Sequence, residues 1–157
     1  MVRLEPMTES EFQIYRARLI RDYAADKVRA GTWLAEDSLS RSEQEIDELL
    51  PNGLVTPDHY LFSIRDVVAA ENVGILWFAV THWGGKDQAF IYDVEVNSDQ
   101  RSKGYGSQAL IGLEDKVKAL GLDRIQLHVF GHNQRARQLY EKLGYEITNI
   151  NMAKKLA

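Results

Sequence analysis

The sequence contains no cysteine, and this absence removes several kinds of chemistry. A disulfide, a thiolate metal site and a cysteine nucleophile are all excluded. Any covalent intermediate on the chain would have to use a group other than a thiol.

Long apolar runs are also missing. The longest uninterrupted one, from Ile75 to Val80, is far shorter than the roughly 20 residues that span a bilayer. The chain does not open with the charged and apolar regions of a secretory signal. We therefore expect no membrane association and a cytoplasmic location.

Charge of one sign is not concentrated anywhere. The 19 basic and 23 acidic residues give a net charge of -4 without a long basic run, so we expect no nucleic-acid partner. The acidic balance fits a cationic acceptor such as an amine, or simply a solvated acidic surface. Of the four histidines only His128 and His132 are four residues apart, and they fall in a predicted strand and the loop after it rather than on one helix face, so we expect no metal site.

The length of 157 residues suits one domain with its own core. A capping box, Thr8 to Glu11, predicts a helix that stops near Gly31, and a second box, Ser40 to Glu43, predicts another that stops at Pro51. Further helices are predicted over residues 105–120 and 133–143. Strands are predicted over residues 2–7, 60–64, 73–81, 89–96, 125–129 and 145–152, the last one extending as far as residue 156. This order predicts a single α/β domain over residues 1–157.

A glycine-punctuated segment, Arg101-Ser102-Lys103-Gly104-Tyr105-Gly106, lies between a predicted strand and a predicted helix. The N–H groups of a helix's first turn are free, and the helix dipole adds positive charge there. Arg101 and Lys103 add two full charges. The segment matches neither the P-loop nor the dinucleotide pattern. It is suited to holding a pyrophosphate.

A second motif follows at residues 133–145 and reads Asn133-x-x-Ala136-x-x-Leu139-Tyr140-x-x-x-Gly144-Tyr145. In this order and spacing, the two segments resemble the GNAT superfamily of acyl-CoA-dependent N-acyltransferases, over residues 89–145. The resemblance implies the GNAT fold, a mixed central sheet flanked by helices. It also implies acetyl-CoA as co-substrate and a primary amine, on a small molecule or a peptide, as acceptor.

The resemblance assigns cofactor contacts residue by residue. The main chain of Val94 and Val96 would hold the pantetheine arm, and Asn133, which also suits a helix N-cap, would contact the cofactor. The loop and first helical turn would hold the pyrophosphate through Arg101, Ser102, Lys103, Gly104, Tyr105, Gly106 and Ser107.

Tyr140 matches the motif tyrosine that acts as general acid toward the leaving thiolate. A phenol with a pKa near ~10 can protonate a thiolate of similar or slightly lower pKa. The same ring could instead pack in the core, since it shares a helix face with Ala136 and Leu143. Both roles are compatible, because the ring can pack while the hydroxyl reaches the cofactor.

Three residues are candidates for the base that deprotonates the amine. Strict alternation along residues 89–96 places Asp93 and Glu95 on one face and Phe90, Tyr92, Val94 and Val96 on the other. Either acid could instead form a salt bridge. His128 lies in the next predicted strand, and an imidazole accepts protons near neutral pH. It could equally be a packed, hydrogen-bonded residue.

The pattern predicts an N-acetyltransferase, with two alternatives left open. One is a binding module that senses acyl-CoA or pairs with a partner protein without turnover. The other is an acyltransferase with a longer acyl group or an oxygen acceptor. The acceptor depends on residues 8–58, the least motif-bearing part of the chain, so its identity stays open, as does the possibility of a homodimer.

Overall fold

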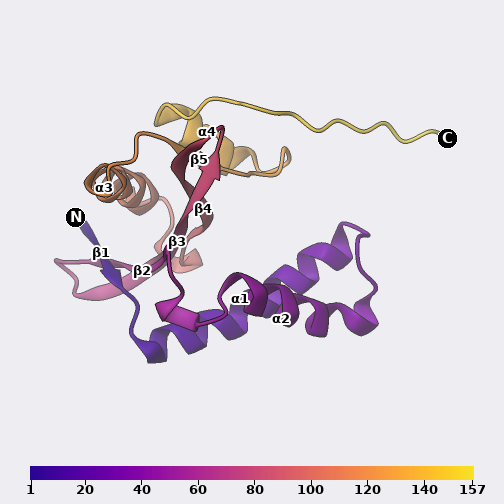
Figure 1. The fold of residues 1–157 in the computed structure, drawn as a ribbon, viewed down its shortest axis with the longest axis horizontal. Helices are drawn as coiled ribbons and strands as arrows, with labels where there is room; N and C mark the ends of the chain where they lie inside the picture. Colours follow the sequence, from indigo (N-terminus) through magenta and orange to yellow (C-terminus); the bar gives the residue numbers. More distant parts are fainter. The chain divides into compact units, whose positions relative to one another are not determined.

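A computed structural model describes all of residues 1–157 and divides the chain into two compact units, Met1–Leu127 and His128–Ala157. Figure 1 shows the elements in chain order. The strands are β1 (Val2–Pro6), β2 (His59–Asp66), β3 (Glu71–Trp83), β4 (Lys86–Val96) and β5 (Ile125–Leu127). The helices are α1 (Glu9–Arg29), α2 (Ser38–Leu49), α3 (Tyr105–Ala119) and α4 (Gln134–Lys142), with short 3₁₀ turns η1 (Ala35–Asp37), η2 (Gly53–Val55) and η3 (Ser98–Gln100).

The first unit contains one five-stranded sheet in the order β1-β2-β3-β4-β5. The first three pairings are antiparallel, and β4 pairs with β5 in parallel. A parallel pair needs a crossover connection, which α3 supplies. The predicted mixed sheet flanked by helices is confirmed.

A β-bulge interrupts β4 at Tyr92. Trp77 of β3 pairs with Asp93, but the next residue, Phe78, pairs with Ile91, so Tyr92 is an extra residue. Beyond a bulge the alternation of side chains changes phase. Asp93 and Glu95 therefore lie on one face, as predicted. The predicted common face of Phe90, Tyr92, Val94 and Val96 is wrong, because Phe90 lies on the face of Asp93.

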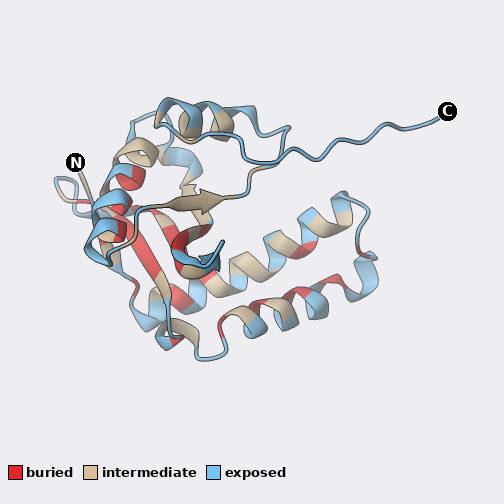
Figure 2. Ribbon diagram, turned by 45° about the horizontal axis from the view of Figure 1, so that its top comes forward, coloured by how far each residue is buried: buried red, intermediate tan, exposed pale blue.

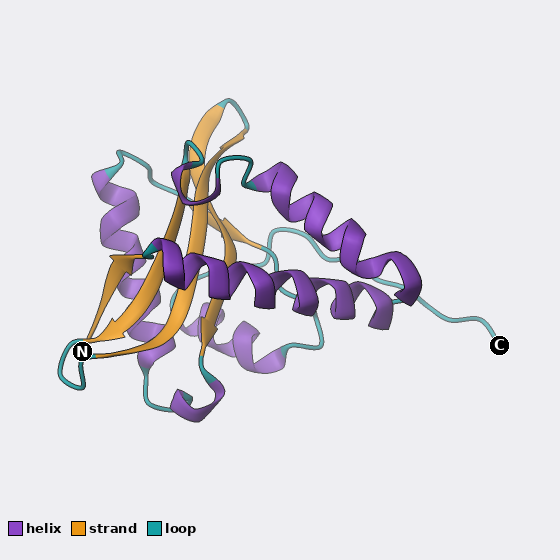
Figure 3. Ribbon diagram, turned by 90° about the horizontal axis from the view of Figure 1, so that it is seen from below, coloured by secondary structure: helices purple, strands orange, loops and turns teal.

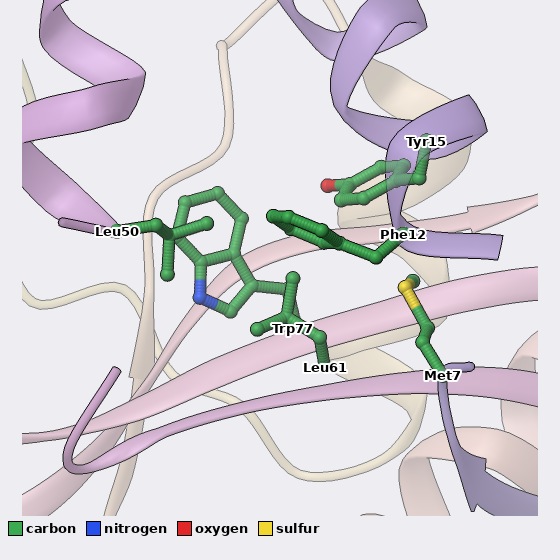
Figure 4. Close-up of a cluster of buried hydrophobic side chains, with 6 residues drawn as sticks. All are labelled: Met7, Phe12, Tyr15, Leu50, Leu61 and Trp77. Atoms are coloured by element: carbon green, nitrogen blue, oxygen red, sulfur yellow. The ribbon is translucent and has the colours of Figure 1, made fainter. Parts of the chain in front are cut away.

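Different helices of the first unit cover the two faces of its sheet, as Figures 2 and 3 show. On one face, α1, the segment after α2 and the sheet contribute a buried cluster, drawn in Figure 4, of Met7, Phe12, Tyr15, Leu50, Leu61 and Trp77. On the other face α3 contacts β1 and β4. There Phe62 stacks near Phe78, with ring centroids 6.1 Å apart, and Lys116 of α3 lies 4.9 Å from the Phe62 ring.

The two predicted capping boxes have different outcomes. The box at Thr8 is confirmed, since its hydroxyl and the Glu11 carboxylate each accept a backbone N–H. The box at Ser40 is wrong, because η1 winds directly into α2 and the helix already begins at Ser38. Ser42 instead donates its hydroxyl to the Ile20 carbonyl at 2.7 Å and joins α2 to α1.

The second unit is built around α4. Its N-cap, Asn133, accepts the N–H of Ala136 at 3.3 Å, and Gly144 has φ 95° just after the helix, as the predicted stop requires. The strand predicted over residues 145–152 is not formed. Its apolar residues change phase between Ile147 and Ile150, so no single face alternates throughout. The strand predicted over residues 125–129 ends at Leu127. None of the helices has the length and apolar character needed to cross a membrane.

Gly74 is required where β3 meets the end of β4. A Cβ atom there would press into the backbone carbonyl of Glu95 and lie 3.0 Å from the Val96 Cα. We predict that Gly74→Ala lowers the free energy of unfolding by about 1–3 kcal/mol, because neither backbone atom can move aside cheaply. Gly131→Ala, where a Cβ meets nothing within 4 Å, is the control. Equal urea midpoints for the two variants would contradict this account.

Candidate active site

Two acidic side chains on β4 face α1, in the part of the strand that follows the bulge. The Tyr15 hydroxyl of α1 donates a hydrogen bond to Asp93 Oδ2 at 2.6 Å. One turn further along α1, Arg18 forms an ion pair with Glu95 at 3.7 Å, and its guanidinium lies 5.6 Å from the centre of the Tyr15 ring. Each acid therefore has its own partner on α1.

The surroundings of Asp93 oppose its ionisation. Its pKa is raised from 3.8 to about 6, mainly by burial; the charge of Glu95 acts in the same direction, while the hydrogen bond from Tyr15 and the charge of Arg18 act against it. Burial outweighs the other effects. A carboxyl group with a pKa near 6 can take up and release a proton near neutral pH.

Aromatic rings surround this acid on the same face. Tyr92, the bulged residue, stacks on Trp77 with centroids 4.7 Å apart and meets the edge of Phe90 at 5.0 Å. The indole N–H of Trp77 donates to His59 Nδ1 at 3.0 Å. Burial lowers the pKa of His59, so the ring is neutral with its proton on Nε2. Tyr92 is 36% exposed, and its ring offers a flat apolar surface beside Asp93.

The predicted phosphate loop ends in an open helix start. Gly104 is the N-cap of α3, with φ 81° and no side chain to cap the helix, so the first-turn N–H groups of Tyr105, Gly106 and Ser107 are not satisfied by a cap. Arg101 donates to the Val96 carbonyl at 3.3 Å, and the Lys103 ammonium donates to Gln100 at 3.0 Å. Both cations are thus held within the loop. The donors and charges suit an anion.

One hydrogen bond anchors this helix start to the sheet. The Tyr105 hydroxyl donates to Asp66 Oδ2 at 2.5 Å, and Asp66 Oδ1 accepts the N–H groups of Val68 and Ala69. The Tyr105 hydrogen bond is the main reason that the pKa of Asp66 is lowered. The side chain of Tyr105 thus ties the loop to β2, while its backbone N–H belongs to the first turn of α3.

The remaining predicted residues belong to the second unit. Asp93, Glu95 and the loop belong to the first unit, residues 1–127. His128, Asn133 and Tyr140 belong to the second unit, residues 128–157. His128 meets the edge of Phe130, with centroids 5.1 Å apart. Tyr140 lies on α4 and meets the edge of Tyr145 at 5.6 Å. Their catalytic and binding roles stay predictions.

Sequence reasoning missed the partners of the predicted residues, above all Tyr15, Arg18 and Asp66. One signal was available for Tyr15: a tyrosine on an apolar helix stripe needs a partner for its hydroxyl. No local pattern links Arg18 to Glu95 or Asp66 to Tyr105. No group of three or more acidic or histidine side chains gathers in a way that could hold a metal ion.

A cleft beside α1 lies away from these acids. It has a volume of about 380 Å³ and opens between α1 and the η2 turn, with Phe12 and Leu50 among its lining residues. Arg16 in its wall is paired with Asp47 at 2.5 Å and with Glu43 at 3.6 Å. None of the predicted catalytic residues is in its lining.

Comparison with known proteins gives the family to which this fold and site belong. The model of the acetyltransferase (GNAT) family matches residues 11–145, and the chain belongs to this family. It is 42% identical to the uncharacterized N-acetyltransferase YycN of Bacillus subtilis over 155 residues, 99% of both chains. It is 37% identical to a second uncharacterized N-acetyltransferase of that bacterium, YdgE, over 98% of this chain and 97% of YdgE. The crystal structure of YycN matches with a TM-score of 0.90 and 41% identity, covering 100% of this chain and 99% of the other.

The raised pKa of Asp93 predicts a pH-dependent effect of Asp93→Asn on stability. A carboxyl group whose pKa rises from 3.8 to about 6 on folding favours the native state below pH 3.8 and loses that contribution as the pH rises through 6. The variant should therefore match the parent near pH 4 and be more stable by about 1–3 kcal/mol above pH 7.

Asp66→Asn is the control of opposite sign, since the pKa of Asp66 is lowered. It should be less stable than the parent at neutral pH, and the difference should shrink as the pH falls below the folded pKa of Asp66. Urea unfolding from pH 2 to 8 measures both, since the window must extend below 3.8, the ordinary pKa of Asp66. This assignment would be contradicted if the Asp93→Asn variant were less stable than the parent by the same amount at every pH.

Proposed function

We propose that this acetyltransferase moves an acetyl group from acetyl-CoA directly to a primary amine of a small molecule or a peptide, with Asp93 as the base and Tyr140 as the general acid. The observation that carries the proposal is Asp93 itself, a partly buried carboxyl group with a pKa near 6 beside an exposed aromatic surface. We also propose that residues 1–157 act as one domain. The family match supports this, since it runs across the division between the two units.

Asp93 accepts a proton from the acceptor's ammonium group, directly or through a water molecule, and frees the nitrogen lone pair. The nitrogen attacks the thioester carbon, the N–C bond forms, and main-chain N–H groups near the end of β4 stabilise the oxyanion. The C–S bond then breaks as Tyr140 gives the leaving thiolate its proton, and the attacking nitrogen passes its surplus proton to the Tyr140 phenolate, which restores the phenol and leaves a neutral amide. No enzyme thiol takes part, because the chain has none.

The loop is suited to the pyrophosphate of acetyl-CoA. The uncapped start of α3 offers N–H groups and the positive end of the helix dipole. Arg101, held to Val96, adds a fixed charge next to the residues proposed to contact the pantetheine arm, Val94 and Val96. Asn133 would contribute a further polar contact.

The function is tested by thiol release from acetyl-CoA with a panel of amines: polyamines, amino acids, aminoglycosides and peptides with free N-termini. The proposal expects release that depends on one class of acceptor and yields an acetylated amine by mass spectrometry. Tight acetyl-CoA binding without turnover on any amine would favour the non-catalytic sensor instead.

The loop assignment predicts the effect of Gly104→Asp. The added carboxylate would repel the pyrophosphate, and a side chain is strained at φ 81°, so acetyl-CoA affinity should fall at least tenfold. Arg101→Ala should weaken binding less, by about 1–2 kcal/mol for one charge-assisted contact. Calorimetry measures both. Parent-like affinity in Gly104→Asp would place the pyrophosphate elsewhere.

The general acid is tested by Tyr140→Phe, which keeps the ring and removes the hydroxyl. Turnover should fall roughly ten- to a thousandfold, as expected for the loss of a proton donor, while acetyl-CoA affinity changes little. Tyr145→Phe, the ring that Tyr140 meets, is the matched control and should retain turnover. A fully active Tyr140→Phe enzyme would assign the ring to packing alone.

A further inference from the structure

Helix α1 carries two tyrosines that each donate a hydrogen bond to a carboxylate, in both cases at 2.6 Å. Tyr15 donates to Asp93 of β4, and Tyr23 donates to Glu45 of α2. The second pair joins two helices and touches none of the predicted site residues. The first pair reaches the acid proposed as base, so only this pair bears on the reaction.

The Tyr15 ring is held rigidly. Its side chain is 3% exposed and packs in the buried cluster with Phe12 and Trp77, drawn in Figure 4. Trp77 is also the cross-strand partner of Asp93. The hydroxyl is thus fixed by the same core that fixes the strand carrying the acid.

The contact engages only one of the two carboxylate oxygens. Tyr15 donates to Asp93 Oδ2, and within residues 1–127 no hydrogen bond engages Oδ1. Asp93 is only half-buried, so it is not sealed from an incoming molecule. A carboxylate held by one oxygen has a fixed orientation and keeps the other oxygen for a second donor.

We propose that Tyr15 is a positioning residue for Asp93: its hydroxyl holds Oδ2, turns Oδ1 toward the acceptor amine and keeps the carboxyl group ionised often enough to accept a proton. This inference rests on the proposed function, in which Asp93 is the base. Tyr15 does not exchange a proton itself, because burial and the charge of Asp93 raise the pKa of its phenol well above 10.

The charges facing Asp93 come from two elements. From α1 these are Arg18 and Asp22, together with the Tyr15 hydroxyl, and from β4 there is Glu95. On the sheet side, Trp77 separates Asp93 from His59 of β2. Of these groups, Tyr15 is the one whose hydrogen bond favours the ionised form of Asp93, against burial. Without that bond the pKa of Asp93 would be higher, because less would oppose the effect of burial.

The test is Tyr15→Phe, with Tyr23→Phe as matched control on the same helix. The carboxyl carbon of Asp93 is titrated by ¹³C NMR in the full-length protein without acetyl-CoA or acceptor, so the readout does not depend on activity. We expect the pKa of Asp93 to rise by about one unit in Tyr15→Phe and to stay at the parent value in Tyr23→Phe. The acid limb of kcat/KM should move to higher pH by the same amount in Tyr15→Phe alone.

Each outcome decides something. An unchanged Asp93 titration in Tyr15→Phe overturns the role of Tyr15, whatever the activity. A shifted titration with an unmoved acid limb shows that Tyr15 controls the carboxyl group but that Asp93 is not the base, which overturns the proposed mechanism and the positioning role built on it. Matching shifts in both measurements support the two together.

A second measurement covers the case in which Tyr15→Phe does not fold. In the parent protein, the ring carbon that bears the Tyr15 hydroxyl should change its ¹³C shift as Asp93 titrates, near pH 6. The same carbon of Tyr23 should show no change at that pH. A Tyr15 signal that is flat between pH 5 and 7 would overturn the proposal.

Discussion

A single extra residue in β4, Tyr92, determines which face of the sheet Asp93 and Glu95 occupy. Trp77 of β3 pairs with Asp93 and Phe78 pairs with Ile91, so Tyr92 is left without a partner on β3. The side-chain alternation of β4 therefore changes phase between Ile91 and Asp93. Without this bulge, continuous pairing would place Asp93 opposite Leu76, on the face of the sheet that α3 covers. With it, Asp93 and Glu95 face α1, where Tyr15 and Arg18 are their partners. The position of both acids therefore depends on the bulge.

The rest of the site follows from how the sheet is packed. Trp77 anchors the buried cluster under α1, pairs across the strands with Asp93 and stacks on Tyr92, so one side chain connects the core to the acid and to the exposed aromatic surface. Burying an acid is costly unless it is hydrogen-bonded. The Tyr15 hydroxyl reduces that cost without removing it, which leaves the carboxyl group with a pKa near neutrality.

Local patterns in the sequence predicted most of the elements, and long-range pairing explains what they missed. The Thr8 capping box, the glycine-ended loop before α3 and the Asn133 cap depend on neighbours within a few residues. The bulge depends on which residues β3 places opposite β4, and no alternation rule contains that information. Tyr15 lies 78 residues from Asp93 in the chain, so their contact becomes visible only in the folded structure. The strand expected over residues 145–152 relied on a pattern that changes phase partway.

The central claim is that Asp93, turned toward α1 by the bulge, takes the proton of the acceptor amine. The most direct measurement is the pH dependence of kcat/KM for the parent and for Asp93→Asn, with Glu95→Gln and His128→Gln as controls. The account predicts an acid limb near pH 6 in the parent and in His128→Gln, a limb at lower pH in Glu95→Gln because the Glu95 charge raises the pKa of Asp93, and the loss of the limb in Asp93→Asn. A limb that persists in Asp93→Asn, or that disappears in His128→Gln, would contradict it.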